Sequence, residues 1–303
     1  MKAILKKLFP VTTRLGMLMR VLLVVAISPN TFLNRFNKIN ISNFLKYGNQ
    51  EFNCPVCGEK SKPIYDFPDV SLRYEHQIGI LRETLQCRHC LASMRHRSLA
   101  LGLIKNLNVK LDKKFSSIAE VKRASLENLA ILDTDNFSAT SNLLRHINGY
   151  TRCSYMPNQP WGLQIQPNYF NINLEKIDFK NESFDIVLTS DVMEHVRNCD
   201  SAHAEIYRIL KPRGVYIFNV PYNENSQENI KLVDTSTDQD EFLCKPQMHG
   251  DPLSGGILAY RVFGRELISK LEKIGFRVEF LRIEQPSSLV INGDVFVATK
   301  SGE

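Results

Sequence analysis

Residues 184–188 read Phe-Asp-Ile-Val-Leu and residues 215–220 read Val-Tyr-Ile-Phe-Asn-Val, two short apolar runs within the stretch 171–222. Runs of this length that are rich in β-branched residues are typical of strands buried on both faces. Between them, apolar residues recur at helical spacing from 202 to 210, and Lys-Pro-Arg-Gly at 211–214 is expected to end that helix. A strand, a crossover helix and a second strand form a βαβ unit, so we expect an α/β fold with a parallel sheet.

Polar side chains follow both predicted strands. Ser190, Asp191, Glu194 and His195 come after the first strand, and Tyr222 follows the second. Parallel sheets bind their ligands beyond the carboxyl ends of the strands. We therefore predict that Asp191, Glu194 and His195 are catalytic, because a carboxylate and an imidazole together can deprotonate a substrate hydroxyl. In the alternative interpretation, His195 caps or packs a helix start and Glu194 pairs with a nearby arginine.

The composition limits the classes of partner. The 303 residues leave room for one large domain and a small one, and 43% hydrophobic with 23% charged residues is ordinary for a globular protein. Residues 1–50 hold eight Lys or Arg and no acid, which leaves 30 basic against 32 acidic residues in the remainder. Nucleic-acid binding requires a basic face on the folded domain, so this near-neutral body argues against a nucleic-acid partner.

The most apolar run of the chain lies at residues 15–28 and contains Arg20. It is shorter than the roughly 20 apolar residues that span a bilayer. Three interpretations stay open: an interfacial or packed helix, a helix that docks on the folded domain, or an export or anchoring segment. We treat residues 1–48 as a basic, apolar helical extension, and residues 1–45 as a candidate for peripheral membrane contact.

Four cysteines form two Cys-x-x-Cys pairs, Cys54-Pro-Val-Cys57 and Cys87-Arg-His-Cys90. Each pair on a tight turn directs two thiolates to one point, and four thiolates satisfy tetrahedral Zn²⁺. We predict a structural zinc site from Cys54, Cys57, Cys87 and Cys90; the alternative is four unrelated cysteines or two disulfides. The other cysteines are scattered and odd in number, which indicates a reducing, cytoplasmic compartment. A helix from residue 93 to about 107 is expected to pack this module, residues 49–108, on the main domain.

A longer match extends the βαβ pattern. Residues 178–196 read Asp-Phe-Lys-Asn-Glu-Ser-Phe-Asp-Ile-Val-Leu-Thr-Ser-Asp-Val-Met-Glu-His-Val, and residues 205–214 read Glu-Ile-Tyr-Arg-Ile-Leu-Lys-Pro-Arg-Gly. This combination resembles the class I S-adenosylmethionine-dependent methyltransferases, most closely their small-molecule and sugar-type branch, over roughly residues 129–300. The resemblance implies that residues 109–303 form a Rossmann-like, mostly parallel seven-stranded sheet flanked by helices, preceded by the small zinc-binding module.

The same resemblance implies which residues bind S-adenosylmethionine. Where the family has an acid followed by a glycine-rich loop, this chain has Asp133-Thr-Asp135-Asn-Phe without glycine, so Asp133 or Asp135 is the partner expected for the ammonium group. Asn173 stands where an aspartate usually accepts from the adenine amino group, and Ile177 and Ser190 complete the predicted cofactor set. The acid that binds the ribose is missing, since no Asp or Glu lies between positions 135 and 175.

The methyl acceptor is expected to be a small molecule or a sugar-type compound. The family branch places a segment like residues 247–256 over the acceptor, so His249 and Asp251, together with Tyr222, are the predicted substrate-binding residues; a plain turn is the alternative for this segment. Two other functions stay open. A zinc module before such a domain also occurs in RNA base methyltransferases, and the altered cofactor loop favours a non-catalytic binding or scaffold protein.

Overall fold

The structure of the protein is a computed structural model, and it describes residues 46–65, 77–124, 126, 129–250 and 256–302. The N-terminal extension that was expected to contact membranes lies outside these residues. None of the helices that the structure describes is long and apolar enough to cross a bilayer.

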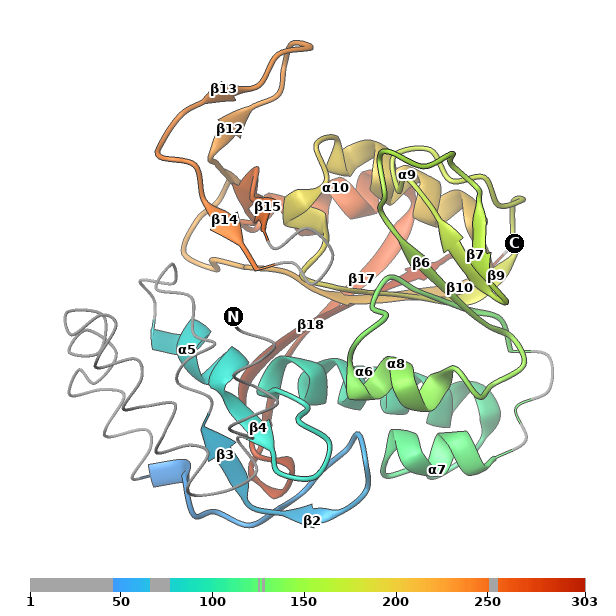
Figure 1. The fold of residues 1–303 in the computed structure, drawn as a ribbon, viewed down its shortest axis with the longest axis vertical. Helices are drawn as coiled ribbons and strands as arrows, with labels where there is room; N and C mark the ends of the chain where they lie inside the picture. Colours follow the sequence, from blue (N-terminus) through green and yellow to red (C-terminus); the bar gives the residue numbers. More distant parts are fainter. Residues whose placement is uncertain (1–45, 66–76, 125, 127–128, 251–255, 303) are drawn as a thin grey trace.

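A twisted eight-stranded sheet forms the centre of the molecule, with the strand order β17-β18-β10-β9-β5-β6-β8-β7 (Figure 1). Its strands are β5 (Ile131–Asp133), β6 (Tyr150–Ser154), β7 (Gln164–Gln166), β8 (Tyr169–Asn171), β9 (Phe184–Ser190), β10 (Leu210–Asn219), β17 (Phe276–Gln285) and β18 (Val290–Lys300). The five strands from β8 to β10 are parallel, and β7, β18 and β17 are antiparallel to their neighbours. The predicted mostly parallel sheet is confirmed, with one strand more than the seven expected because β7 adds a hairpin at the edge.

The predicted βαβ unit is β9, α9 (Cys199–Ile209) and β10. The helix ends earlier than predicted: Leu210 already pairs with Phe184 in the sheet, and the register shifts before Val215. Residues 211–214 therefore form an irregularity within β10, where proline can sit without a ladder hydrogen bond, and do not form the helix end.

Alternating side chains on the buried strands build two cores, one on each face of the sheet. Ile186 and Ile217 point into the first core, and their neighbours Val187 and Phe218 point into the second. This is the period of two that a pleated strand imposes. In Figure 1, α6 (Met94–Leu111), α7 (Ile118–Arg123) and α8 (Ala139–Leu144) cover one face, and α9 and α10 (Glu266–Ile274) cover the other.

The N-terminal module contains α5 (Gln77–Thr84) and four short strands, β1 (Phe52–Asn53), β2 (Lys60–Ser61), β3 (Pro63–Tyr65) and β4 (Leu85–Cys87). Its Phe52 and Leu85 belong to the same buried cluster as Leu103 of α6 and Ile217 of β10. Helix α6 therefore packs the module on the sheet, as the sequence predicted. The division into domains at residues 48 and 108 stays a prediction.

The remaining elements are short and lie beyond the carboxyl edge or between the last two strands of the chain. They are η2 (Met193–His195), β11 (Ile230–Lys231), β12 (Val233–Asp234), β13 (Glu241–Phe242), β14 (Met248–His249), β15 (Ile257–Leu258), β16 (Arg261–Val262) and η3 (Pro286–Ser288). The pairs β12–β13 and β14–β15 are antiparallel hairpins, and the first projects away from the body in Figure 1.

Arg97 of α6 is completely buried and joins the module to the far end of the chain. Its guanidinium donates to the backbone carbonyls of Leu85 and Ala92 in the module, at 2.9 and 2.8 Å, and of Ser288 and Leu289 between β17 and β18, at 3.1 and 2.8 Å. Burial lowers the pKa of Arg97 to about 10, so the group is still charged at neutral pH. The buried Arg97 cation is thus stabilised by hydrogen bonds to four backbone carbonyl oxygens.

We expect Arg97→Met to lower the free energy of unfolding by about 3–5 kcal/mol, because it leaves these buried carbonyls without donors. Chemical denaturation monitored by circular dichroism measures this. Lys105→Met is the control, since Lys105 is half exposed and makes one surface ion pair with Glu279, worth about 1 kcal/mol or less. Equal stability of the Arg97 and Lys105 variants would contradict the role assigned to Arg97.

Candidate active site

Asp191 follows β9 at the carboxyl edge and is held by two arginines of the N-terminal module and α6. Arg82 donates to both carboxylate oxygens, with Nη2 2.6 Å from Oδ1, and Arg95 Nε lies 3.2 Å from Oδ2. Glu83 completes the network with a 2.7 Å bond from Arg95. Burial alone would raise the pKa of Asp191, but the two guanidiniums outweigh it and lower that pKa to about 2. Asp191 is therefore an ionised anchor at neutral pH, and its catalytic role stays a prediction.

Glu194, His195 and His249 form a second polar cluster beside this network. The Glu194 side chain is fully buried, and its Oε1 lies 3.5 Å from His195 Nε2 and 3.8 Å from His249 Nδ1. The two facing nitrogens are 3.2 Å apart. Burial, together with the charge of Asp191, raises the pKa of Glu194 well above its ordinary value. The structure thus brings together two predicted catalytic residues and one predicted substrate-binding residue.

The segment that carries Glu194 and His195 is fixed by contacts with the β15–β16 region. His195 Nδ1 lies 2.7 Å from the Leu258 carbonyl, and because a carbonyl only accepts, this nitrogen carries the proton. Arg261 of β16 is buried and donates to the carbonyls of Met193, Val196 and Arg197. Arg261 could not be predicted from the sequence, because a lone arginine in a short polar segment gives no local sign of three carbonyl partners.

The glycine-free turn after β5 holds its side chains in local contacts. Asp133 is buried, accepts from the Tyr150 hydroxyl at 2.6 Å and from the Asp135 amide at 2.9 Å. Asp135 Oδ1 accepts from the amides of Phe137 and Ser138 at the start of α8. Asp133 therefore faces inward, whereas 22% of the Asp135 side chain is exposed. Of the two candidates for an ammonium partner, only Asp135 is partly exposed.

Asn136 fills the space between the ends of β5 and β6. Its Nδ2 donates to the Cys153 carbonyl at 2.8 Å and to Ser154 Oγ at 2.6 Å. Its Oδ1 is buried and has no hydrogen-bond partner within the part of the chain that the structure describes. The residues present fit the expected cofactor in this respect, because a buried acceptor remains at this edge for a hydroxyl or ammonium donor.

The other predicted site residues lie in different surroundings. Ser190 accepts from Arg95 and donates to Asn219, and Asn173 Oδ1 accepts from the Glu175 amide at 3.0 Å. Ile177 is buried in the second core. Tyr222 packs its ring against Phe280 and Phe296. Asp251 lies outside the described residues. The roles proposed for all of these residues stay predictions.

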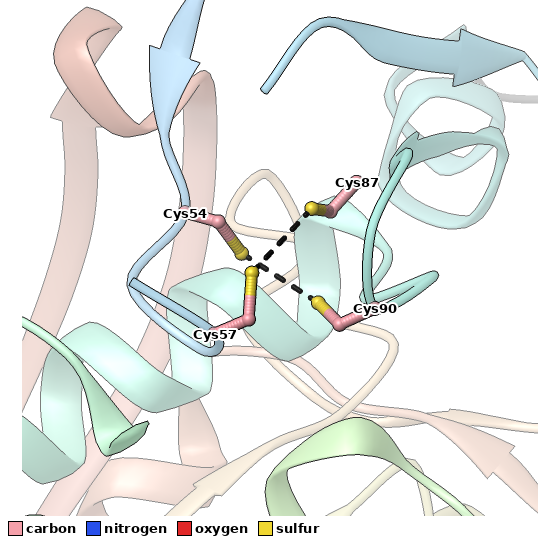
Figure 2. Close-up of side chains that lie close together, drawn as sticks. All are labelled: Cys54, Cys57, Cys87 and Cys90. Carbon is pink, nitrogen blue, oxygen red and sulfur yellow. Dashed lines mark hydrogen bonds between the residues drawn. The ribbon is translucent and has the colours of Figure 1, made fainter. Parts of the chain in front are cut away.

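The four predicted zinc ligands converge on one point (Figure 2). Cys54 Sγ lies 3.7 Å from Cys90 Sγ, and Cys57 Sγ lies 3.8 Å from Cys87 Sγ. A tetrahedron of thiolates about 2.3 Å from a zinc ion has edges of about 3.8 Å, so the donor set fits this ion. All four cysteines are free in the structure, which contradicts the alternative of two disulfides.

Comparison with known proteins finds a family model that is similar to the βαβ region. Residues 143–218 match the family model described as "Methyltransferase domain". Among curated proteins, sterol 24-C-methyltransferases of Clavispora lusitaniae and Candida albicans are 26% and 24% identical over 119 residues, which is 37% of this chain and 27% of each relative. The chain thus spans about a quarter of the length of the curated relatives that it matches.

Two solved structures illustrate the similarity found among known folds. S-adenosylmethionine-dependent methyltransferases of Methanosarcina mazei and, described as putative, of Listeria monocytogenes are 19% and 15% identical. Each match covers 60% of this chain and 98% and 96% of the other chain, with TM-scores of 0.37 and 0.38.

The buried Asp133 predicts a pH dependence of stability. Burial, followed by the charge of Asp135, raises the pKa of Asp133 to about 8, against 3.8 for the unshifted group. The folded protein therefore binds a proton that the unfolded chain has lost, and the free energy of unfolding falls as pH rises between these values, by at most about 1.4 kcal/mol per pH unit. Asp133→Asn should flatten this fall, measured by denaturation from pH 5 to 8. The exposed Asp238→Asn is the control, and the idea fails if both variants follow the wild type.

Proposed function

We propose that this protein is an S-adenosylmethionine-dependent methyltransferase that acts on a small-molecule or sugar-type acceptor. The observation that carries the proposal is the methyltransferase-domain match over residues 143–218, which runs from just before β6 into β10 and includes Asp191, Glu194 and His195. The partial match to sterol 24-C-methyltransferases supports an acceptor of small-molecule size. The order of the parallel strands supplies the carboxyl edge at which ligands of such sheets bind.

The residues proposed to hold the cofactor lie after β5, after β8 and at the end of β9. Asp135 offers a charged acceptor and Asn136 Oδ1 a neutral one, while Ser190 and Asn173 are the further candidates from the sequence. When bound, the cofactor supplies an electrophilic methyl group for in-line transfer. The contribution of the chain is then mainly to position the acceptor.

His195 is the proposed general base. Its Nδ1 proton is engaged with the Leu258 carbonyl, which leaves Nε2 as the acceptor nitrogen, pointing toward Glu194 and His249. An imidazole held in this tautomer can take a proton from an acceptor hydroxyl. His249 and Tyr222 are the proposed substrate contacts among the described residues.

A non-catalytic binding or scaffold protein is the second candidate. The turn after β5 favours it, because Asp133 is turned inward toward Tyr150 and the Asn136 side chain occupies the space between two strand ends. A side chain in this place keeps a ligand farther from the backbone than a glycine would.

The four cysteines are proposed to bind one structural zinc ion in a reducing, cytoplasmic compartment. Because Cys54 and Cys87 lie in the core shared with α6, the ion would also fix the position of that helix. All four protein ligands together leave no open coordination position, which argues against a catalytic role for this ion.

Cofactor binding is tested by titration calorimetry with S-adenosylhomocysteine. We expect binding to the wild type and an affinity about tenfold lower for Asp135→Asn, because a charge-assisted hydrogen bond becomes a neutral one while the α8 contacts are kept. Asp112→Asn, at the far end of α6, should bind like the wild type. No heat of binding with the folded wild type would reject the methyltransferase and leave the scaffold interpretation.

Zinc binding at the cysteines is tested by elemental analysis of purified protein. Wild type and Cys244→Ser, which changes an exposed free cysteine, should retain zinc, and Cys57→Ser should lose it and unfold at a lower temperature. Folded protein without metal, with thermal unfolding unaffected by a strong chelator, would remove the zinc assignment.

A further inference from the structure

Three donor atoms at the candidate active site lie at the spacing of ligands around one metal ion. Glu194 Oε1, His195 Nε2 and His249 Nδ1 form a triangle with sides of 3.2, 3.5 and 3.8 Å. The point equidistant from the three corners of such a triangle lies about 2.0 Å from each atom, which matches zinc–nitrogen and zinc–carboxylate bonds of about 2.0–2.2 Å. No rearrangement of these side chains is needed to reach bonding distance.

The carboxylate of Glu194 supplies an independent reason for a cation. Its side chain is completely buried, and neither Oε1 nor Oε2 has a hydrogen-bond partner among the residues that the structure describes. The two histidine nitrogens lie at 3.5 and 3.8 Å, beyond hydrogen-bond range. A buried carboxylate without donors is costly, and a bound cation removes that cost.

The histidines are oriented as metal ligands are. His195 directs Nδ1 to the Leu258 carbonyl at 2.7 Å, and metal-binding histidines usually give their other ring N–H to such an acceptor. Its Nε2 faces His249 Nδ1 at 3.2 Å, where two N–H protons would clash, so at least one of these nitrogens presents a lone pair. Arg261 fixes the backbone on both sides of Glu194 and His195.

We propose that Glu194, His195 and His249 bind a divalent transition-metal ion such as Zn²⁺, with at least one coordination position left for substrate. A carboxylate and two imidazoles are a ligand set that holds catalytic zinc in other proteins and leaves a position open. The site differs in chemistry from the four-cysteine cluster, which provides only sulfur. In the metal-bound protein His195 Nε2 is a ligand, so the general-base role proposed above belongs to the metal-free protein.

The metal site also indicates the chemical class of the methyl acceptor, an inference that rests on the proposed function. An ion at this position favours an acceptor with a hydroxyl group, because oxygen is a suitable ligand and loses its proton more easily when bound to such an ion. Metal binding itself does not depend on methyl transfer, so the two proposals can fail separately.

The test is a Co²⁺ titration of folded protein that carries zinc at its cysteines and has been dialysed against a weak chelator. We expect one Co²⁺ ion to bind, with weak visible bands of nitrogen and oxygen ligands and without the strong near-ultraviolet charge transfer of thiolates. Glu194→Gln and His249→Ala should lose this ion, whereas His146→Ala, a change of an exposed histidine away from the cluster, should keep it.

Folding of the Glu194→Gln variant is checked by circular dichroism, and its melting temperature should no longer rise with added Co²⁺. The proposal is overturned if the wild type binds no additional ion, or if the variants at the cluster bind it as tightly as His146→Ala. S-adenosylhomocysteine binding by metal-free protein is measured in parallel. If the protein binds S-adenosylhomocysteine but no additional metal ion, only the metal site is refuted. If it binds the metal ion but not S-adenosylhomocysteine, only the proposed function is refuted.

Discussion

The buried guanidinium of Arg97 is the constraint on which the arrangement of the molecule depends. It makes no ion pair with the described residues and donates hydrogen bonds to carbonyls of the cysteine module and of the turn before β18. Its position therefore fixes the first turn of α6, whose Arg95 reaches Asp191 and Ser190 at the carboxyl edge. The cysteine module, the central sheet and the active-site edge are connected through this one turn of helix.

Much of the fold followed from sequence because buried parallel strands have a simple composition. The apolar runs in β9 and β10 are too short for helices and were assigned to strands. Apolar residues at helical spacing between them indicated the crossover helix. Strand β7 was not predicted, since the alternation Gln-Ile-Gln covers only three residues and contains no apolar run. The early start of β10 was also missed, because Leu210 could equally continue the helix and only pairing with Phe184 decides between the two.

Site residues could be predicted where they follow the end of a strand. They could not be predicted where contacts between distant segments place them. Glu194 and His195 follow β9 directly, and the spacing of the four cysteines is typical of a metal site. The roles of Arg82 and Arg261 could not be predicted, because their partners are a distant carboxylate and three backbone carbonyls. The inward orientation of Asp133 depends on Tyr150, a contact between neighbouring strands that no local pattern encodes. His249 joins the cluster only because β14 and β15 return the chain to η2.

The position of β18 has a consequence for synthesis of the chain. Among the described elements this strand comes last in chain order, yet it pairs with β10 on one side and β17 on the other. Until β18 has left the ribosome, the growing sheet exposes the unpaired edge of β10, and α6 lacks part of the surface on which it packs. Premature termination within the last strand would leave two open strand edges that invite aggregation. A tag or fusion partner is therefore better tolerated beyond the end of β18 than inserted within it.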